Sequence, residues 1–444
     1  MTLCSSNVTS GFIDLATFDE IERHLYGGED AAAYFVRDTK RSTWFTQVPV
    51  CLSRAAGSPD FGQEWSVSVS RAGDYLLHTW LRVTLPQVTH AATAAAGNRL
   101  RWTRNLMHNL ISECAITFND LVAARFDNYH LDFWAAFTVP QSKRVGYNNM
   151  IGNITDLTDG VAPSASLPSV TLNLPIPFFY SRDSGVALPT AALPYNEMRI
   201  NFRFRDYTEL LVVHDTTVAA GVGHATKATS SDVSAVPKLD AAQVWANYAI
   251  VSNEERRRMA CAPRDVVIEQ VQTAPRQSFN PSSSQSYDLR FSHAIKALFF
   301  AVRNKTVESE WSNYTTSLSY HDGTVMTHTP IDGADPILQT SLIYENTNRL
   351  AQMGSDYFSL VNPYYHAPAI PTETGYHSYS YSLDFLSLDP KGSTNYGKLT
   401  NVSIVPEASD SAKNATNNVF EFVVTAVNNN IVRISGGALG FPVL

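Results

Sequence analysis

The sequence predicts an all-β protein that contains two similar β-domains. Three observations support this class: short runs of alternating or β-branched residues recur along the chain, only two short helices are indicated, and several features repeat at about half the chain length. The chain has 444 residues. That length suits two or three domains and allows large cores without metals or disulfides.

Nine segments have the strand pattern, and many short strands without long helices are typical of β-sandwiches and closed barrels. The predicted strands are residues 65–69, 75–83, 115–118, 198–204, 244–251, 266–271, 297–302, 402–405 and 420–427. Typical turn residues separate them. The clearest turns are Asn119-Asp120, Asp322-Gly323, Asp332-Gly333 and Gly436-Gly437.

The second half of the chain repeats features of the first. In each half a short apolar run is followed by a turn, an aromatic cluster, a proline and a Gly-Tyr pair. The matched features are Phe118 and Tyr344, the clusters 129–137 and 357–365, Pro140 and Pro368, and Gly146 and Gly375. The offsets between the paired single residues, 226, 228 and 229, are nearly constant. They indicate a duplicated β-domain.

A short helix is predicted between the two copies, from Asn253 to about Cys261. Asn253 is expected as its N-cap, acidic residues occupy its first turn, and Pro263 ends it. This helix is a natural linker. Long stretches rich in Ala, Ser, Thr and Gly, near residues 87–99, 156–169 and 216–238, are expected to be exposed loops.

A second short helix is predicted at Phe18–Tyr26, ahead of the first strand. Thr17 and Glu20 have the spacing of a capping box, and Gly27-Gly28 ends the helix. Its apolar residues share one face. Either this segment packs against neighbouring proteins or a membrane, or it closes the base of its own β-domain.

The composition excludes disorder for most of the chain and argues against a dedicated nucleic-acid binder. Charged residues are 17% and aromatic residues 11% of the chain, whereas disordered segments are rich in charge and poor in aromatics. The formal net charge is −8, from 33 basic and 41 acidic residues. A protein that binds nucleic acid directly usually has a basic domain or stripe.

Neither a membrane helix nor a secretion signal is expected. The longest apolar run, residues 297–302, is far shorter than the roughly 20 residues that a bilayer requires. The N-terminus lacks a basic region followed by an apolar one. The cysteines at positions 4, 51, 114 and 261 form no CxxC motif, so reduced thiols, buried or partly buried, are expected. Six Asn-x-Ser/Thr sequences occur, but nothing indicates that they are glycosylated.

The sequence indicates no catalytic, cofactor-binding or metal-binding site. It has no GxSxG, HExxH or P-loop motif, and its twelve histidines form neither HxH nor HxxxH. Gly221-Val222-Gly223 begins like a dinucleotide-binding loop, but Thr226 stands where the third glycine belongs. No cofactor is therefore expected, and the chain is not expected to be an enzyme.

Four other groups of residues have both a functional and a structural interpretation. Asp183 and Glu197 could form a carboxylate pair for sugar chemistry, but an Arg182 ion pair at a domain corner, with a turn at 183–185, is the favoured alternative. A solvated or interface helix face is preferred over phosphate binding for residues 256–258. Cross-strand aromatic packing is preferred over a sugar platform for residues 376–381. His293 is expected to be structural.

Long stretches of the chain, among them SGFIDLATFDEIERHLYGG (10–28) and MGSDYFSLVNPYYHAP (353–368), resemble the major capsid proteins of iridoviruses, which are large cytoplasmic DNA viruses. The resemblance covers both halves and both termini and departs mainly in the loops near 87–99, 216–238 and 404–417. The stretches in the first half are SGFIDLATFDEIERHLYGG (10–28), FGQEWSVSVSRAGDYLLHTWL (61–81), RWTRNLMHNLI (101–111), LPIPFFYSRDSGVALPTAALPYNE (174–197) and EERRRM (254–259). Those in the second half are VVIEQVQ (266–272), RFSHAIKALFF (290–300), MGSDYFSLVNPYYHAP (353–368), GSTNYGKLTN (392–401) and GALGFPVL (437–444).

This resemblance implies two tandem eight-stranded jelly rolls joined by a short helical linker. The expected parts are an N-terminal arm at 1–38, a first jelly roll at 39–252, the linker at 253–263 and a second jelly roll at 264–444. It also implies a homotrimeric, pseudo-hexagonal capsomer in an icosahedral shell around an internal membrane. Minor capsid proteins would be further partners, and assembly would take place in the host cytoplasm.

Two other functions are compatible with the same fold. Jelly rolls also occur in carbohydrate-binding and sugar-processing proteins, so the fold alone does not decide the function. A scaffold or minor capsid protein could also use a double jelly roll. The interpretation as a major capsid protein rests on the long stretches of resemblance.

Overall fold

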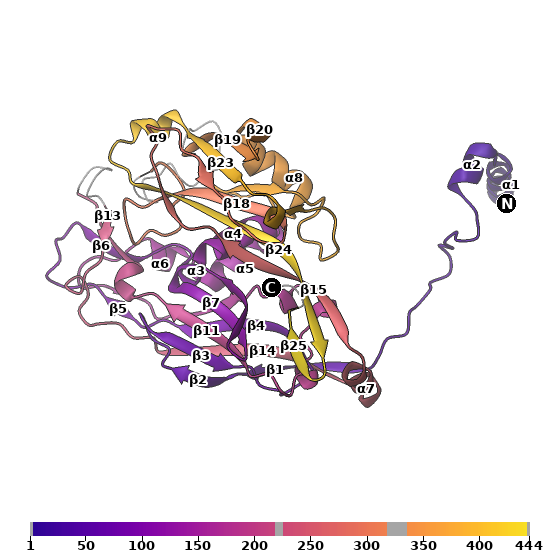
Figure 1. Cartoon of the computed structure of the whole chain (residues 1–444), viewed down its shortest axis with the longest axis horizontal. Helices are drawn as coiled ribbons and strands as arrows, with labels where there is room; N and C mark the ends of the chain where they lie inside the picture. The colour runs from indigo at the N-terminus through magenta and orange to yellow at the C-terminus, as the bar shows by residue number, and fades with distance from the viewer. Residues whose placement is uncertain (1–2, 218–224, 318–334, 442–444) are drawn as a thin grey trace. The chain divides into compact units, whose positions relative to one another are not determined.

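The computed structural model describes residues 3–217, 225–317 and 335–441. The chain divides into two compact units, Met1–Trp44 and Phe45–Leu444. The second unit contains all the sheets (Figure 1). The dinucleotide-like Gly221-Val222-Gly223 and the turns at 322–323 and 332–333 lie outside the described residues. In the described parts of the chain, no helix is long and apolar enough to cross a membrane.

The N-terminal unit contains two helices, α1 (Leu3–Ala16) and α2 (Glu20–Leu25). The predicted helix 18–26 is therefore shorter than expected, and its capping box is wrong. Asp19 is the N-cap, and its carboxylate accepts a hydrogen bond from the backbone N–H of Ile21 (3.0 Å). The Thr17 hydroxyl instead donates to the Asp14 carbonyl (2.6 Å). Helix α1 was not predicted, because its polar N-terminal half shows little helical periodicity.

The first half of the second unit is a β-sandwich with two main sheets (Figure 1). One has the order β1-β14-β4-β10, and the other has the order β2-β3-β11-β7-β8. The first sheet consists of β1 (Phe45–Cys51), β14 (Ala241–Val251), β4 (Tyr75–Thr84) and β10 (Thr171–Pro175). The second consists of β2 (Ser53–Gly57), β3 (Glu64–Ser68), β11 (Met198–Phe204), β7 (Ile111–Phe118) and β8 (Leu121–Phe126).

Alternating apolar residues of the two sheets meet in one core, as strand geometry requires. In β11, Ile200 and Phe202 are buried between exposed or half-buried neighbours, and Leu81 and Val83 of β4 belong to the same cluster. A smaller sheet extends this core with Trp102 and Leu211. Its strands are β13 (Ala225–Lys227), β12 (Leu211–Asp215) and β6 (Asn98–Trp102).

The loops predicted to be exposed in the first half are partly ordered and buried. β5 (Val88–Thr89) pairs with β9 (Ser166–Leu167), so two of these loops form a small ribbon. His90, in the first loop, is fully buried and forms a bridge with Val233 of the third. Long-range pairing between loops has no local sequence signal, which is why it was not predicted.

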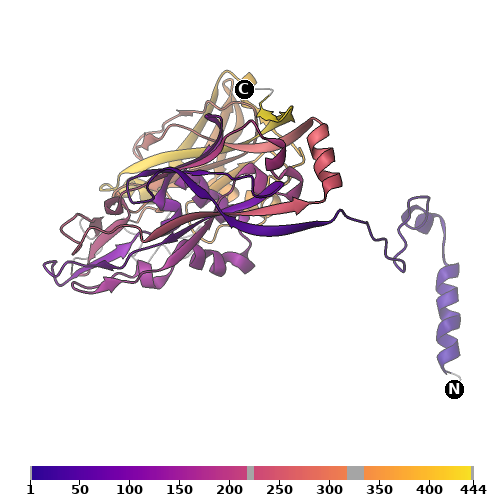
Figure 2. The same ribbon diagram turned by 90° about the horizontal axis from the view of Figure 1, so that it is seen from below.

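The second half forms a second β-sandwich (Figure 1). Its larger sheet has the core order β15-β24-β18-β21, and its smaller sheet is β17-β23-β19-β20. The larger sheet consists of β15 (Arg264–Thr273), β24 (Phe420–Ser435), β18 (Ala294–Asn304) and β21 (His377–Ser380), with the short strands β16 (Gln277–Phe279), β22 (Thr394–Asn395) and β25 (Ala438–Gly440). The smaller consists of β17 (Tyr287–Asp288), β23 (Val402–Ala408), β19 (Ile337–Tyr344) and β20 (Thr347–Gly354). In the view from below, the first sandwich lies in front of the second (Figure 2).

The two sandwiches repeat a hairpin at the predicted offset of 226. The β7–β8 turn places Asn119 and Asp120 at φ 48° and 66°, and the β19–β20 turn places Glu345 and Asn346 at φ 47° and 65°. Two successive residues with positive φ match the twist of a tight hairpin. This confirms the duplication, and all nine predicted strands are confirmed as well.

The aromatic clusters that follow these hairpins are helical, so the prediction of only two short helices was wrong. The first cluster forms α4 (Asn128–Thr138) and the second forms a π-helical turn (Tyr357–Val361) followed by α8 (Asn362–His366). Asp127 caps α4 by accepting from the backbone N–H of His130 (3.0 Å). The remaining α-helices are α3 (Leu106–Leu110), α5 (Gln141–Ile151), α6 (Thr155–Thr158), α7 (Asn253–Cys261) and α9 (Asp410–Asn414). Short 3₁₀ turns lie at 179–181, 184–186, 190–192, 207–209 and 396–398.

The predicted helix between the two halves is confirmed as α7, with one correction. Its N-cap is Ser252, and Asn253 is the first helical residue. Arg256 forms a bidentate salt bridge with the buried Asp74 of the first sandwich (2.8 and 2.9 Å). Burial opposes ionisation of Asp74, but the hydrogen bonds from Arg256 and from the Val251 backbone outweigh it and lower its pKa.

The prediction for the cysteines is correct for Cys114 and wrong for two others. Cys114 is buried in the first core, and burial raises its pKa well above the usual value. Cys51 and Cys261 are exposed, although both are free as expected. Cys51 lies on β1, which pairs on one side only and forms the sheet edge. Edge strands are poorly covered, so burial cannot be inferred from residue type there.

Candidate functional site: the interface between the two sandwiches

The most extensively built feature outside the two cores is the interface between the sandwiches, and α4 lies at its centre (Figure 1). Tyr129, Phe133 and Phe137 recur at four-residue spacing on one face of α4, and each is fully buried. They pack with residues of the second half in one cluster. Its members from the second half are Ala297, Phe299, Ala301, Tyr314, Tyr376, Phe385, Val423 and Val427.

The α4 helix covers one face of the larger sheet of the second sandwich. In β18 the side chains of Leu298 and Phe300 belong to the core of the second sandwich, whereas Phe299 belongs to the α4 cluster. The ring of Phe299 stacks on those of Phe133 (6.2 Å between centroids) and Phe137 (5.3 Å). This sheet is therefore buried on both faces, which explains why residues 297–302 are uninterrupted apolar residues.

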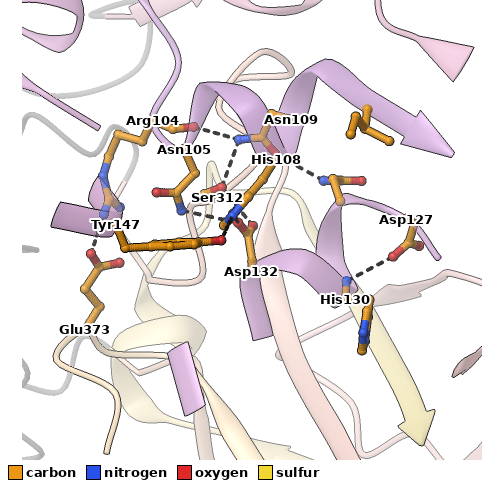
Figure 3. A network of polar contacts seen from close by, with 12 residues as sticks. Arg104, Asn105, His108, Asn109, Asp127, His130, Asp132, Tyr147, Ser312 and Glu373 are labelled. Carbon is orange, nitrogen blue, oxygen red and sulfur yellow. Dashed lines mark hydrogen bonds and ion pairs between the residues drawn. The ribbon is translucent and has the colours of Figure 1, made fainter. Parts of the chain in front are cut away.

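Asp132, on the same helix, is buried and accepts four hydrogen bonds. Figure 3 shows Asp132 beside three of the donors, Asn105, His108 and Ser312. Two donors come from the first sandwich, Asn105 Nδ2 (3.2 Å) and His108 Nδ1 (2.7 Å), and both bind Oδ1. Two come from the second half, the hydroxyl groups of Ser312 and Tyr314 (each 2.8 Å), and both bind Oδ2. One carboxylate thus joins both halves, and each of its oxygens is fully used.

The network continues into both halves. His108 Nε2 lies 2.6 Å from the hydroxyl group of Tyr147 on α5. Asn109 Nδ2 donates to the hydroxyl oxygen of Ser312 (2.9 Å), which adds a direct link between the halves. Burial, followed by the charge of Asp132, raises the pKa of Tyr147 far above its usual value. The Tyr147 phenol is therefore protonated at any physiological pH.

Trp311 forms a second link between the halves. Two guanidinium groups lie over its ring, Arg205 from the first sandwich (3.8 Å from the ring centroid) and Arg303 from the second (4.0 Å). Its indole N–H donates to the Glu209 carbonyl (2.9 Å). Burial lowers the pKa of Arg205 to about 10, so the guanidinium group keeps its charge at neutral pH. Stacking of cations on the half-buried indole stabilises such contacts.

Ion pairs complete the interface, and most of their side chains are buried. Arg101 pairs with Glu310 and Arg104 with Glu373, in each case across the two halves. Glu269 of the second sandwich binds Arg182 of the first (2.8 Å) and also Lys296. Losing one partner of a buried pair leaves an uncompensated charge and costs about 3–5 kcal/mol. These pairs form across the two halves in the observed placement of the sandwiches, so they favour a fixed arrangement.

The structure tests each residue group that the sequence analysis singled out. Arg182 does form an ion pair between domains, as the favoured alternative predicted, and its guanidinium group stacks on Trp134 (4.2 Å). Asp183 is exposed and precedes the turn at 184–186. Glu197 is also exposed and binds Arg199 (2.6 Å). The carboxylate of Glu197 is therefore engaged by a cation.

The aromatic packing predicted for 376–381 is confirmed. Tyr379 belongs to the second core, Tyr376 belongs to the α4 cluster, and His377 stacks on Phe300 with 5.2 Å between centroids. His293 has φ 64°, and its carbonyl accepts from the Tyr396 backbone N–H (3.3 Å). Arg258 pairs with Glu254 (2.8 Å) within α7.

Apart from Arg182, the interface role of the residues that join the two sandwiches was not predicted. The spacing of Tyr129, Phe133 and Phe137, with Asp127 as N-cap ahead of them, is a helical signal that was available. Asp132 offered none, because a lone aspartate on a helix is usually exposed. Within the described residues, no group of three or more His, Cys, Asp or Glu side chains could hold a metal ion. The geometry defines a double β-sandwich whose polar groups hold the two halves together.

Comparisons with known proteins agree with this class. Residues 33–251 match the sequence model for the N-terminus of major capsid proteins, and residues 255–440 match that for major capsid proteins of large eukaryotic DNA viruses. The chain is 64% identical to the major capsid protein of Costelytra zealandica iridescent virus, with full coverage of both chains. It is also 64% identical to that of Wiseana iridescent virus, covering 98% of this chain and 94% of the relative.

Among solved structures, a chain of the PBCV-1 virus capsid matches with a TM-score of 0.74. The match covers 93% of this chain and 100% of that one at 19% identity, so it supports the fold alone. The two sequence relatives carry the assignment further: the chain belongs to the family of iridovirus major capsid proteins. It is a structural protein of a large DNA virus, located in the capsid of the virion, where it assembles with copies of itself.

Replacing Asp132 is expected to destabilise the protein strongly. Asp132→Leu removes four hydrogen bonds and leaves buried donors unpaired, so the free energy of unfolding should fall by about 3–5 kcal/mol. Asp132→Asn keeps one acceptor oxygen and should cost about 1–3 kcal/mol. Urea unfolding followed by tryptophan fluorescence measures both. The exposed Asp389 is the control, and Asp389→Leu should change stability by less than about 0.5 kcal/mol. An Asp132→Leu variant as stable as this control would contradict the account.

His130 on α4 is expected to weaken the protein as the pH falls. Burial, followed by the charge of Arg182, lowers its pKa to about 3. The unfolded chain binds this proton near pH 6.5. His130 therefore contributes full stability above pH 6.5 and loses it on acidification, by at most about 1.4 kcal/mol per pH unit.

This dependence is measured by urea unfolding from pH 7 to 4 at fixed protein concentration. His130→Phe retains the ring next to Phe126 and Trp134, and it should show a flatter decline than the unmodified protein. Changing the exposed His24 to Gln should leave the slope as it is. Identical slopes for His130→Phe and the unmodified protein would show that His130 titrates normally.

Proposed function

We propose that this protein forms a homotrimeric, pseudo-hexagonal capsomer. The observation that carries the proposal is the duplicated β-sandwich held as one block by α4 and Asp132. Two similar sandwiches in each of three copies supply six similar walls around a three-fold axis. Closed symmetry of this kind gives a finite particle, and a block with near-hexagonal walls packs on a lattice.

The capsomer would tile the icosahedral shell of a double-stranded DNA virus around an internal membrane, after assembly in the host cytoplasm. Minor capsid proteins would be additional partners. The relatives' names and the PBCV-1 fold match support this role. The chain would make no direct contact with nucleic acid, in keeping with its net charge of −8. It would act by binding other capsid subunits and would catalyse no reaction, since its buried polar groups bind one another.

The proposed parts of the chain are an arm at 1–38, a first jelly roll at 39–252, a linker at 253–263 and a second jelly roll at 264–444. The two family matches, at 33–251 and 255–440, support a division close to α7. The N-terminal unit extends to Trp44, which is six residues beyond the proposed end of the arm. The proposed boundaries divide the chain along its sequence only. In space, the interface joins the two sandwiches into one compact unit.

The trimer is tested by the mass of the purified protein, measured by light scattering coupled to size exclusion. We expect a species near 147 kDa, three times the chain mass of 49.0 kDa. The helical content and unfolding midpoint should show that this species is folded. A stable, folded species of 49.0 kDa at every concentration would contradict the trimer.

The N-terminal arm would pack at the inner face of the capsomer, against neighbouring proteins or the internal membrane. Its apolar side chains support a binding role, since Phe12, Ile21 and Leu25 are each about half or more exposed. Deleting residues 1–28 tests this. We expect a truncated chain that still folds and forms trimers but fails to assemble shells, whereas loss of the folded trimer would show that the arm completes its own subunit.

A further inference from the structure

An open apolar groove lies on the first sandwich beside the interface. It has a volume of about 850 Å³, within the usual range of ligand-sized clefts. One wall is the α4–α5 corner, with Trp134, Val139 and Met150, and the other is the segment after β10, with Ile176. Trp134 is half-buried and Met150 is 37% exposed. Apolar grooves of this size on a capsid subunit are typical of interaction sites.

The groove also has a basic edge. Its basic lining side chains are His78, Lys143 and Arg182, and no aspartate or glutamate is among the described residues that line it. Arg182 is engaged by Glu269, but Lys143 is exposed on α5 at the edge of the groove. A matching partner would combine an apolar stripe with acidic residues.

The N-terminal arm has this combination. In α1, the exposed Val8, Phe12 and Leu15 fall on one stripe at helical spacing. In α2, Ile21 and Leu25 form a second exposed pair four residues apart. Residues 3–28 contain four carboxylates against one arginine. The 18 residues 27–44 that follow α2 can span at most about 60 Å when extended, which is enough to reach another subunit.

We propose that the acidic, apolar arm of one copy, residues 3–28, docks in the α4–α5 groove of a neighbouring copy. The arm binds as an amphipathic helix in a groove, with Lys143 facing its carboxylates. This inference rests on the proposed capsomer and names the surface that receives the arm. Each subunit then both gives and receives an arm, which gives a closed ring of identical contacts.

A photo-crosslinker tests the contact in the full-length protein. Benzoylphenylalanine replaces Phe12 in a tagged chain, which is co-expressed with an excess of untagged, unmodified chain. Irradiation should give a dimer-sized product on a denaturing gel, because the arm reaches a different copy. Peptide mass spectrometry should place the bond within residues 131–150 or 175–182. A product of monomer size would show that the arm docks on its own subunit, and would overturn the proposal.

Blocking the groove gives a matched comparison. A side chain added at Gly146, which lines the groove, meets no atom within 4 Å, so Gly146→Phe in the untagged chain fills the groove without disturbing the fold. The dimer product should fall by at least about tenfold. Gly440 is equally open but lies on β25, and Gly440→Phe should leave the yield unchanged. Equal yields for the two variants would overturn the proposal.

The charges provide a second variant. Lys143→Glu in the untagged chain should lower the yield by about two- to fivefold, and Glu20→Lys in the tagged chain should restore it. An unchanged yield of the crosslinked dimer with Lys143→Glu would contradict the proposed contact between Lys143 and the carboxylates of the arm. Phosphatidylcholine vesicles should leave the product intact. Flotation of the protein with the vesicles and loss of the product would assign the arm to a membrane instead.

The particle mass separates the two proposals. A species near 147 kDa without a crosslink in the groove would refute the docking site and leave the trimer standing. A 49.0 kDa species without a dimer product would refute both. A 147 kDa species with the mapped crosslink supports both.

Discussion

The burial of α4 between the two sandwiches is the constraint on which the rest of the structure depends. One face of the helix supplies Tyr129, Phe133 and Phe137 to an aromatic cluster with the second sandwich, and Asp132 accepts hydrogen bonds from both halves. The aromatic contacts supply apolar burial, which has little directional preference. The buried carboxylate adds direction, because its four donors are all satisfied only when the sandwiches are correctly placed.

This rigidity connects the duplicated fold with the capsid role. Two similar sandwiches present repeated surfaces to neighbours only if the angle between them is fixed. A flexible linker would let that angle vary, and contacts with neighbouring copies in the capsid would then fail to match. The polar groups of the interface therefore have a functional role, because they fix the angle between the sandwiches on which assembly depends.

The sequence predicted the sheets well and the interface poorly, for physical reasons. Strands such as β11 alternate apolar and polar residues locally, so both their position and their buried face follow from the sequence. The cluster at 129–137 is apolar on one side because it packs on a distant sheet, and no helix was predicted there. Asp132 could not be found, since its partners Ser312 and Tyr314 lie about 180 residues away. Arg182 was placed correctly because a charged residue in an apolar stretch must find a counter-charge.

The most direct test of this account is hydrogen exchange measured by mass spectrometry in increasing urea. Buried amides of β7 and β11 in the first sandwich should open with the same free energy and urea dependence as those of β19 and β23 in the second, because α4 couples the two halves. In Asp132→Leu the opening free energies of both sets should fall together. Two distinct opening free energies in the unmodified protein, with one sandwich exchanging while the other stays protected, would show that the sandwiches fold independently and would contradict the account.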